Sequence, residues 1–150
     1  MEGPWNSPPV YEPPSAEACA AVAEVYHRVD AVLAPVASAC RACGKCCRFE
    51  PGGIVLFASA VELAYLVAET PAARAPTAGD SWRCPYQREN LCTARGARLL
   101  GCRTYFCDAK AREVGEDVYA DALREIRRIA AGQGPWWYGP ARVYLEAVTP

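Results

Sequence analysis

Eight of the nine cysteines in this chain fall in two blocks, and this distribution constrains the fold more than any other sequence feature. The first block packs four cysteines into a single short run, and the second spreads four over a later stretch of chain. The eight positions are Cys40, Cys43, Cys46, Cys47, Cys84, Cys92, Cys102 and Cys107. Triplet spacing lets successive thiolates turn toward one centre, as zinc and iron–sulfur sites require. The pattern predicts a metal site that orders two cysteine-rich segments.

Metal binding is favoured over disulfide bonding because we expect a soluble, cytoplasmic protein. Residues 1–15 are proline-rich and acidic, unlike a secretion leader, and no apolar run approaches the roughly 20 residues that cross a bilayer. A reducing cytosol leaves thiols available for metal, whereas disulfides would require export and would leave one of nine cysteines unpaired. We therefore expect no membrane partner.

The charge balance argues against nucleic acid as a partner. The chain has 16 Lys and Arg against 17 Asp and Glu, and its pI near 5.9 gives no electrostatic attraction to phosphate backbones. Its 150 residues are the length of one domain. We expect a flexible, proline-rich N-terminus at residues 1–14 and a single cysteine-cluster metal-binding domain at residues 15–150.

Apolar spacing predicts three helices. Ser15 is an N-cap candidate for a first helix that runs toward Pro35. The run Ser59-Ala60-Val61-Glu62 has the pattern of a capping box and opens a second helix. A third helix is predicted from about Ala111 to Ala131. The residues expected on the three buried faces are Ala18, Val22, Val25, Val29 and Val32, then Leu63, Leu66 and Val67, then Val114, Val118, Ala122, Ile126 and Ile129.

The remaining segments carry weaker signals. Gly96 and Gly101 predict irregular turns in the second cysteine block. The aromatic tail from Trp136 to Val148 alternates weakly, which suits a short strand or an extended segment. The predicted fold class is therefore mainly α, a small helical domain with irregular cysteine-rich loops ordered by metal and a short C-terminal strand.

The adjacent pair Cys46-Cys47 bears on the number of metal centres. Neighbouring side chains point in different directions in most backbone conformations, so this pair favours two centres or a bridged one. Eight thiolates satisfy two closed Cys₄ zinc sites, or one 4Fe–4S cluster and a second metal. A closed site is structural, whereas a site lacking one thiolate has an open position for chemistry.

The spacing of the cysteines resembles that of YkgJ-type cysteine-cluster proteins. The chain reads CxxCxxCC and then CP(x)₆CxxxxxRxxxCRx[FY]xC, covering about Cys40 to Cys107. The resemblance implies a zinc- or iron-chelating domain of a kind also found in flagellin lysine N-methylases. One departure is Leu99, where the family usually has a proline after the arginine aligned with Arg98. This difference changes the rigidity of a turn and removes no ligand.

Three functions are compatible with these observations. The first is a metal-binding protein that chelates zinc or an iron–sulfur centre through the eight cysteines. The second is an iron–sulfur enzyme or accessory redox component related to lysine N-methylases, although the chain has no Gly-rich nucleotide fingerprint. The third is a metal-delivery module, or one that docks a protein partner through Trp136-Trp137. The sequence leaves open whether the chain is an enzyme.

Several other residues have simpler interpretations. Cys19 falls on the apolar face of the first helix and is expected to be a buried thiol. His27 lies on the polar face and is expected to be exposed. Asp108 precedes the third helix and is expected to begin it. Arg103 lies between two predicted ligands, and Arg98 lies nearby in the sequence. Both cations are therefore candidates to offset thiolate charge.

Overall fold

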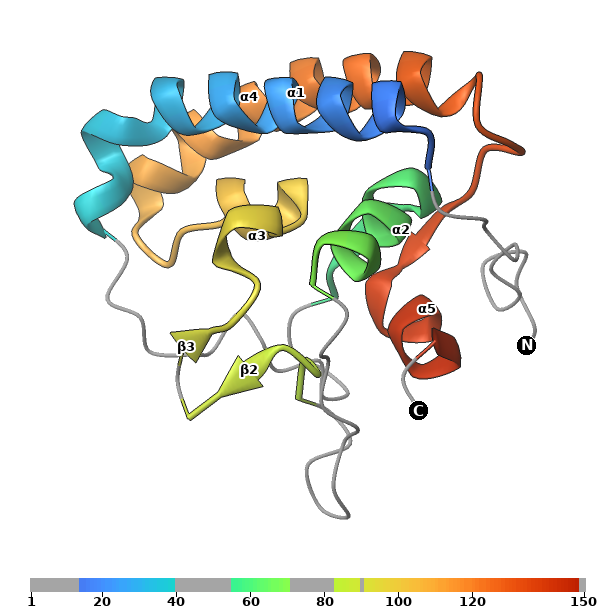
Figure 1. Ribbon diagram of the computed structural model, residues 1–150. Helices are drawn as coiled ribbons and strands as arrows, with labels where there is room; N and C mark the ends of the chain where they lie inside the picture. Colours follow the sequence, from blue (N-terminus) through green and yellow to red (C-terminus); the bar gives the residue numbers. More distant parts are fainter. Residues whose placement is uncertain (1–13, 40–54, 71–82, 90, 149–150) are drawn as a thin grey trace.

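The computed structural model describes residues 14–39, 55–70, 83–89 and 91–148 of the 150-residue chain (Figure 1). The elements in chain order are α1 (Ala16–Leu33), the 3₁₀ helix η2 (Ala34–Ala39), β1 (Phe57–Ser59), α2 (Ala60–Glu69), β2 (Gln87–Arg88), β3 (Leu91–Cys92), the 3₁₀ helix η4 (Arg95–Ala97), α3 (Leu100–Thr104), α4 (Ala109–Ala130), β4 (Tyr138–Pro140) and α5 (Ala141–Val148). The mainly α fold class predicted from the sequence is confirmed.

Helices α1 and α4 lie side by side and antiparallel, and the shorter helices pack beneath them (Figure 1). The predicted N-cap of α1 is confirmed, since the Ser15 hydroxyl accepts a hydrogen bond from the Ala18 amide at 3.1 Å. The Ser15 amide in turn donates to Oε1 of Gln133, which lies just beyond the end of α4, at 3.0 Å. Further along the two helices, Arg28 of α1 and Glu125 of α4 form an ion pair. These contacts fix where the two long helices lie along each other.

Most residues predicted on the buried faces of these two helices are buried or half-buried, and one predicted residue of each helix is exposed. In α1 the apolar stripe passes from Val29 to Leu33, and Val32 is 56% exposed. In α4 the prediction that Val114 is buried was wrong, because the buried stripe runs through Ala111 and Gly115 instead. The reason is close packing against α3, which small side chains permit and valine does not.

Helix α2 begins with the predicted capping box. The Ser59 hydroxyl accepts from the Glu62 amide at 3.4 Å, and the Ser59 amide donates to the Glu62 carboxylate at 2.9 Å. Leu63 and Leu66 are buried as expected, and Val67 is half-buried. The helix packs against α4 and α5, so its first turn lies in the core of the domain.

The C-terminal tail is partly a strand and partly a helix. Strand β4 pairs antiparallel with β1, with Ala58 opposite Gly139. The strand prediction is therefore confirmed, but an extended structure for the rest of the tail was wrong. Residues 141–148 form α5 because Ala141, Tyr144 and Leu145 are spaced for one helix face, and all three are buried.

The second cysteine block is also more regular than predicted. A two-stranded hairpin, β2 and β3, is followed by η4 and α3. Gly101 lies inside α3 rather than in a turn. A Cβ at this position would lie 2.4 Å from Cδ1 of Leu56, so the glycine allows the two residues to pack closely. Glu89 has φ of 55°, the left-handed conformation that a tight hairpin turn needs. The prediction of irregular turns was thus wrong for this part of the block.

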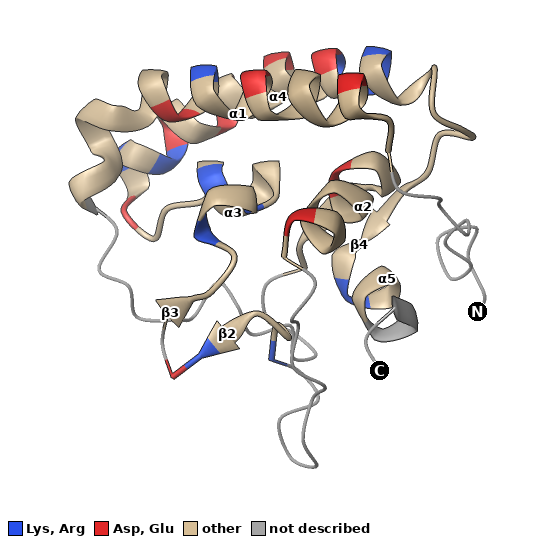
Figure 2. Cartoon of the chain, in the orientation of Figure 1, with Lys and Arg blue, Asp and Glu red and all other residues tan. Residues whose placement is uncertain are grey.

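Charged residues of both signs are interspersed along α1 and α4 (Figure 2). In the part of the chain that the structure describes, no helix combines the length and the apolar character needed to cross a membrane.

Candidate metal centre

The predicted ligands divide between described and undescribed parts of the chain. The first block, Cys40, Cys43, Cys46 and Cys47, lies outside the described residues. In the second block, Cys84 precedes the hairpin, Cys92 lies in β3, Cys102 lies in α3, and Cys107 is exposed just before α4. The first three are half-buried. All four lie outside disulfide bonds, so each sulfur could lose its proton to give the thiolate that binds a metal.

Hydrogen bonds to backbone carbonyls hold the hairpin, which carries Cys92, and the turn before it, which carries Cys84. The Gln87 amide donates to the Cys84 carbonyl at 3.0 Å, and Gln87 pairs with Cys92 across the strands. The Thr93 amide donates to the Tyr86 carbonyl at 2.8 Å, and Nη1 of Arg88 donates to the Pro85 carbonyl, also at 2.8 Å. The two cysteines are thus connected through one short hairpin.

Helix α3, which carries Cys102, is positioned by a carboxylate from another helix. Leu99, the N-cap of α3, has no side chain that can accept a hydrogen bond. Instead the Leu100 amide donates to Oε1 of Glu62 at 2.9 Å. The same carboxylate accepts from the Tyr26 hydroxyl at 3.2 Å and from the Ser59 hydroxyl at 2.7 Å. Glu62 is 1% exposed and joins α1, α2 and α3.

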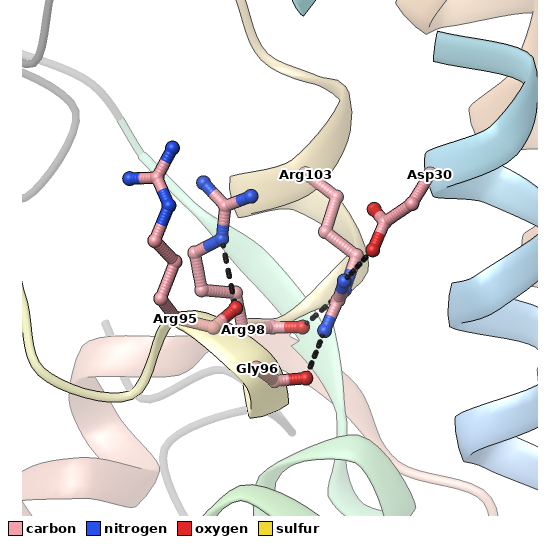
Figure 3. Close-up of polar contacts among 5 residues, drawn as sticks. All are labelled: Asp30, Arg95, Gly96, Arg98 and Arg103. Atoms are coloured by element: carbon pink, nitrogen blue, oxygen red, sulfur yellow. Dashed lines mark hydrogen bonds and ion pairs between the residues drawn. The ribbon is translucent and has the colours of Figure 1, made fainter. Parts of the chain in front are cut away.

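Arg103 in α3 anchors the same helix to α1 and η4 (Figure 3). Its Nη1 lies 2.6 Å from the Asp30 carboxylate, its Nη2 donates to the Gly96 carbonyl at 2.6 Å, and its Nε donates to the Arg98 carbonyl at 2.8 Å. Its guanidinium carbon lies 4.1 Å from the centre of the Tyr26 ring. Among the described residues, the Arg103 guanidinium therefore bonds to a carboxylate and two carbonyls, and its role in offsetting thiolate charge stays a prediction.

Arg95 and Arg98 remain as cations beside the second block. The Arg98 Nε donates to the Arg95 carbonyl at 3.2 Å, and the ends of both side chains point away from Asp30 (Figure 3). Within the described ranges, neither guanidinium is ion-paired with a carboxylate. Such cations are suited to offset the excess negative charge of thiolate ligands.

Two buried tyrosines lie close enough to the cysteines to be affected by their charge. Burial, and then the charges of Cys84 and Tyr144, raise the pKa of Tyr86 to about 12. Burial and the nearby Glu62 carboxylate raise the pKa of Tyr26 well above its usual range, and Cys102 adds a smaller effect in the same direction. Cys84 therefore lies near the Tyr86 phenol, and Cys102 lies near the Tyr26 phenol.

The second block does not make a complete metal site by itself. No three histidine, cysteine, aspartate or glutamate side chains are grouped as metal ligands in the ranges that the structure describes. A complete site would therefore combine Cys84, Cys92, Cys102 or Cys107 with ligands from the first block.

The remaining candidates behave mostly as the sequence predicted. Cys19 is half-buried, its Sγ lies 3.7 Å from the Pro14 carbonyl, and burial raises the pKa of its thiol. His27 is exposed. Asp108 caps α4 by accepting from the Ala111 amide at 2.9 Å.

The Trp136-Trp137 pair is not a continuous exposed patch. Trp137 is buried, and its ring centre lies 6.4 Å from that of Tyr144. Trp136 is on the surface, stacked on Tyr138 and beneath the Arg127 guanidinium. The pair therefore offers one exposed ring to a partner rather than two.

Comparisons with protein-family profiles, with curated proteins and with solved structures gave no match to this chain.

Proposed function

We propose that this chain is a metal-binding protein that holds zinc or an iron–sulfur centre through Cys40, Cys43, Cys46, Cys47, Cys84, Cys92, Cys102 and Cys107. The spacing of these residues supports membership of the YkgJ-type cysteine-cluster family. The proposed location is the cytoplasm, where thiols stay reduced.

One structural observation carries the proposal. In the second block Cys84, Cys92 and Cys102 are half-buried and Cys107 is exposed, so none of the four is closed off in the core. Cys102 lies on a five-residue helix that Glu62 and Arg103 hold from two sides. Cys92 lies on a hairpin strand. Side chains on supported elements would need less ordering to bind a metal than side chains on unsupported loops, which favours the proposal.

In this proposal the metal links the two cysteine blocks. The free energy of metal binding becomes folding free energy, because an unfolded chain holds no preformed site. Arg95 and Arg98 would reduce the net negative charge of a Cys₄ centre, since neither has a carboxylate partner among the described residues.

The direct test is elemental analysis and an absorption spectrum of protein purified anaerobically without a metal-affinity tag. Zinc without visible absorption indicates closed structural sites. Iron with inorganic sulfide and a broad brown absorption indicates a cluster, which directs further work to redox chemistry. A folded protein that contains neither metal contradicts the proposal.

A matched pair of variants links the metal to particular residues. Cys92→Ser is expected to lower the bound metal per chain and the midpoint of thermal unfolding. Cys19→Ser serves as the control, because Cys19 lies on α1 and contacts the Pro14 carbonyl. Equal metal content in both variants and the unchanged protein would show that Cys92 is not a ligand.

A further inference from the structure

A pocket of about 680 Å³ lies between β1, α3, α4 and β4. This volume is within the range of roughly 300–1,000 Å³ that is typical of small-molecule sites. Cys102 contributes to its wall from α3, and Leu56 contributes from the residues just before β1. The pocket is thus formed by parts of the chain that are far apart in sequence and pack together only in the folded domain.

Four aromatic rings give the pocket its apolar character. They belong to Phe57, Tyr105, Tyr119 and Tyr138. The Phe57 and Tyr138 ring centres are 5.6 Å apart, and the hydroxyls of Tyr119 and Tyr138 share a hydrogen bond. Burial, followed by that hydrogen bond, raises the pKa of Tyr119. Because the two hydroxyls bond to each other, the rings offer mainly their apolar faces to an occupant.

Two exposed residues of opposite charge line the same pocket, one turn apart on α4. Arg112 donates through Nε to the Phe106 carbonyl at 3.1 Å and through Nη2 to the Cys107 carbonyl at 3.2 Å. Its guanidinium also lies 5.5 Å from the centre of the Tyr105 ring. These contacts fix the orientation of Arg112 but do not neutralise its charge, because both oxygens belong to peptide groups.

Glu116 supplies the opposite charge and is not paired with Arg112. Although the two residues are separated by four positions, a spacing that often allows ion pairs in helices, no salt bridge joins them. Within the described parts of the chain, the Glu116 carboxylate accepts no hydrogen bond. The pocket therefore presents a cation and an anion, each with bonding capacity for a ligand.

We propose that this pocket binds a small zwitterion with an aromatic or branched apolar body, of the kind represented by an apolar amino acid. The ligand carboxylate would bind Arg112, its ammonium group would bind Glu116, and its apolar body would contact the aromatic rings. A ligand with only one charge would leave the other charged residue without a partner. Cys102 belongs both to this pocket and to the proposed metal site, but the ligand contacts assigned here are to Arg112, Glu116 and the aromatic rings.

The test uses calorimetric titration of the full-length protein with three probes that share a phenyl ring. L-Phenylalanine has both charges, phenethylamine has only the ammonium group, and 3-phenylpropanoate has only the carboxylate. We expect L-phenylalanine to bind at least about tenfold more tightly than either singly charged probe, because each added charged hydrogen bond contributes about that factor.

Variants of the protein then test whether the ligand ammonium group binds Glu116. Glu116→Gln is expected to weaken L-phenylalanine binding by about tenfold while binding of 3-phenylpropanoate is unchanged or improves. Glu113→Gln is the control, because Glu113 is an exposed carboxylate of α4 that does not line the pocket. Phe57→Ala should weaken the binding of all three probes. Leu91 is another exposed apolar residue, and Leu91→Ala should weaken the binding of none of them.

Circular dichroism establishes that each variant is folded before titration. Absence of L-phenylalanine binding at millimolar concentration by folded protein would overturn the proposal. Equal affinity for the three probes, or equal effects of Glu116→Gln and Glu113→Gln, would also overturn it, because both results remove the role assigned to paired charges.

Discussion

The guanidinium of Arg103 lies 2.6 Å from the carboxylate of Asp30, although 73 positions separate the two residues in the chain. The two partners differ in environment, since the Arg103 side chain is 3% exposed and the Asp30 side chain is 49% exposed. Arg103 also donates hydrogen bonds to two backbone carbonyls through its other nitrogens. The pair therefore joins α3 to α1 through a buried cation and a partly hydrated anion.

Removing the cation should cost far more stability than removing the anion. Arg103→Met leaves the Gly96 and Arg98 carbonyls and the Asp30 carboxylate without their donor, so we expect unfolding free energy to fall by about 3 kcal/mol. Asp30→Asn keeps an oxygen acceptor near water and should cost about 1 kcal/mol. Urea unfolding followed by circular dichroism measures both.

The control for this prediction is Arg124→Met. Arg124 forms an exposed ion pair with Asp121 one turn away in α4, and such pairs contribute only about 0.5 kcal/mol or less. A loss in Arg103→Met no larger than that in Arg124→Met would contradict the anchoring role of Arg103.

Removing the hydroxyl from each of two buried tyrosines should change the unfolding free energy in opposite directions. Tyr26→Phe removes a donor to the buried Glu62 carboxylate and should lower the unfolding free energy by about 1.5 kcal/mol. Tyr86→Phe should raise it by about 1 kcal/mol, because the Tyr86 hydroxyl is buried without a hydrogen-bond partner among the described residues. Urea unfolding of both variants checks the signs, and destabilisation by Tyr86→Phe would show that this hydroxyl has a partner.

The same tyrosines predict a loss of stability in alkaline solution. Burial and the charges of Cys84 and Tyr144 raise the pKa of Tyr86 from 10.0 to about 12. The unfolded chain therefore loses this proton first, so the stabilisation is complete below about pH 10 and declines as pH rises toward 12. Tyr26 adds to the effect in the same direction. The slope of unfolding free energy above pH 10 should be shallower in Tyr86→Phe, and an unchanged slope would contradict the assignment.

The sequence predicts helices best where local signals and tertiary packing agree. Ser15, the capping box at Ser59 and the N-cap Asp108 each identify a helix start, because the hydrogen bond that caps a helix is formed within a few residues. The tail helix α5 was missed because the aromatic residues before it suggested a strand, and residues 141–148 cover only about two turns.

The hydrogen bonds that hold the second cysteine block in place could not be predicted in the same way. Glu62 is recognisable as a capping-box residue, but nothing local indicates that its carboxylate also reaches Leu100 and Tyr26. Arg103 stands beside Cys102, which suggests charge compensation, yet its partner Asp30 comes from a helix far away in sequence. Such contacts depend on tertiary packing, which hydrophobic periodicity does not specify.

Replacing Gly115 by alanine, which adds a single carbon, should lower the unfolding free energy. A Cβ at this position would lie 1.9 Å from the Thr104 carbonyl oxygen, where α4 crosses α3. Alanine favours a helix over glycine by up to about 1 kcal/mol, but the overlap forces the helices apart, so we expect Gly115→Ala to lose about 3 kcal/mol or more. At Gly96 a Cβ meets nothing within 4 Å. Gly96→Ala is the control, and equal unfolding free energies for the two variants would contradict the close approach.

The start of α3 allows a sharper test, because two adjacent leucines differ in what their amides do. Leu99 and Leu100 are both buried, so replacing either by proline loses similar apolar contact. Leu99 has φ of −58°, which is close to the value that proline fixes, and Arg98 before it has the extended conformation that proline requires.

Leu100 is the first residue of α3, a position where proline is normally well tolerated. Here, however, its amide donates to the buried Glu62 carboxylate at 2.9 Å, and proline has no such donor. We therefore expect Leu100→Pro to be less stable than Leu99→Pro by about 2 kcal/mol, the cost of leaving a buried charged acceptor short of one bond. Urea unfolding at matched metal content gives the difference directly. Equal stability of the two variants would mean that the bond from Leu100 to Glu62 does not support α3, and the preorganisation of Cys102 would then rest on Arg103 alone.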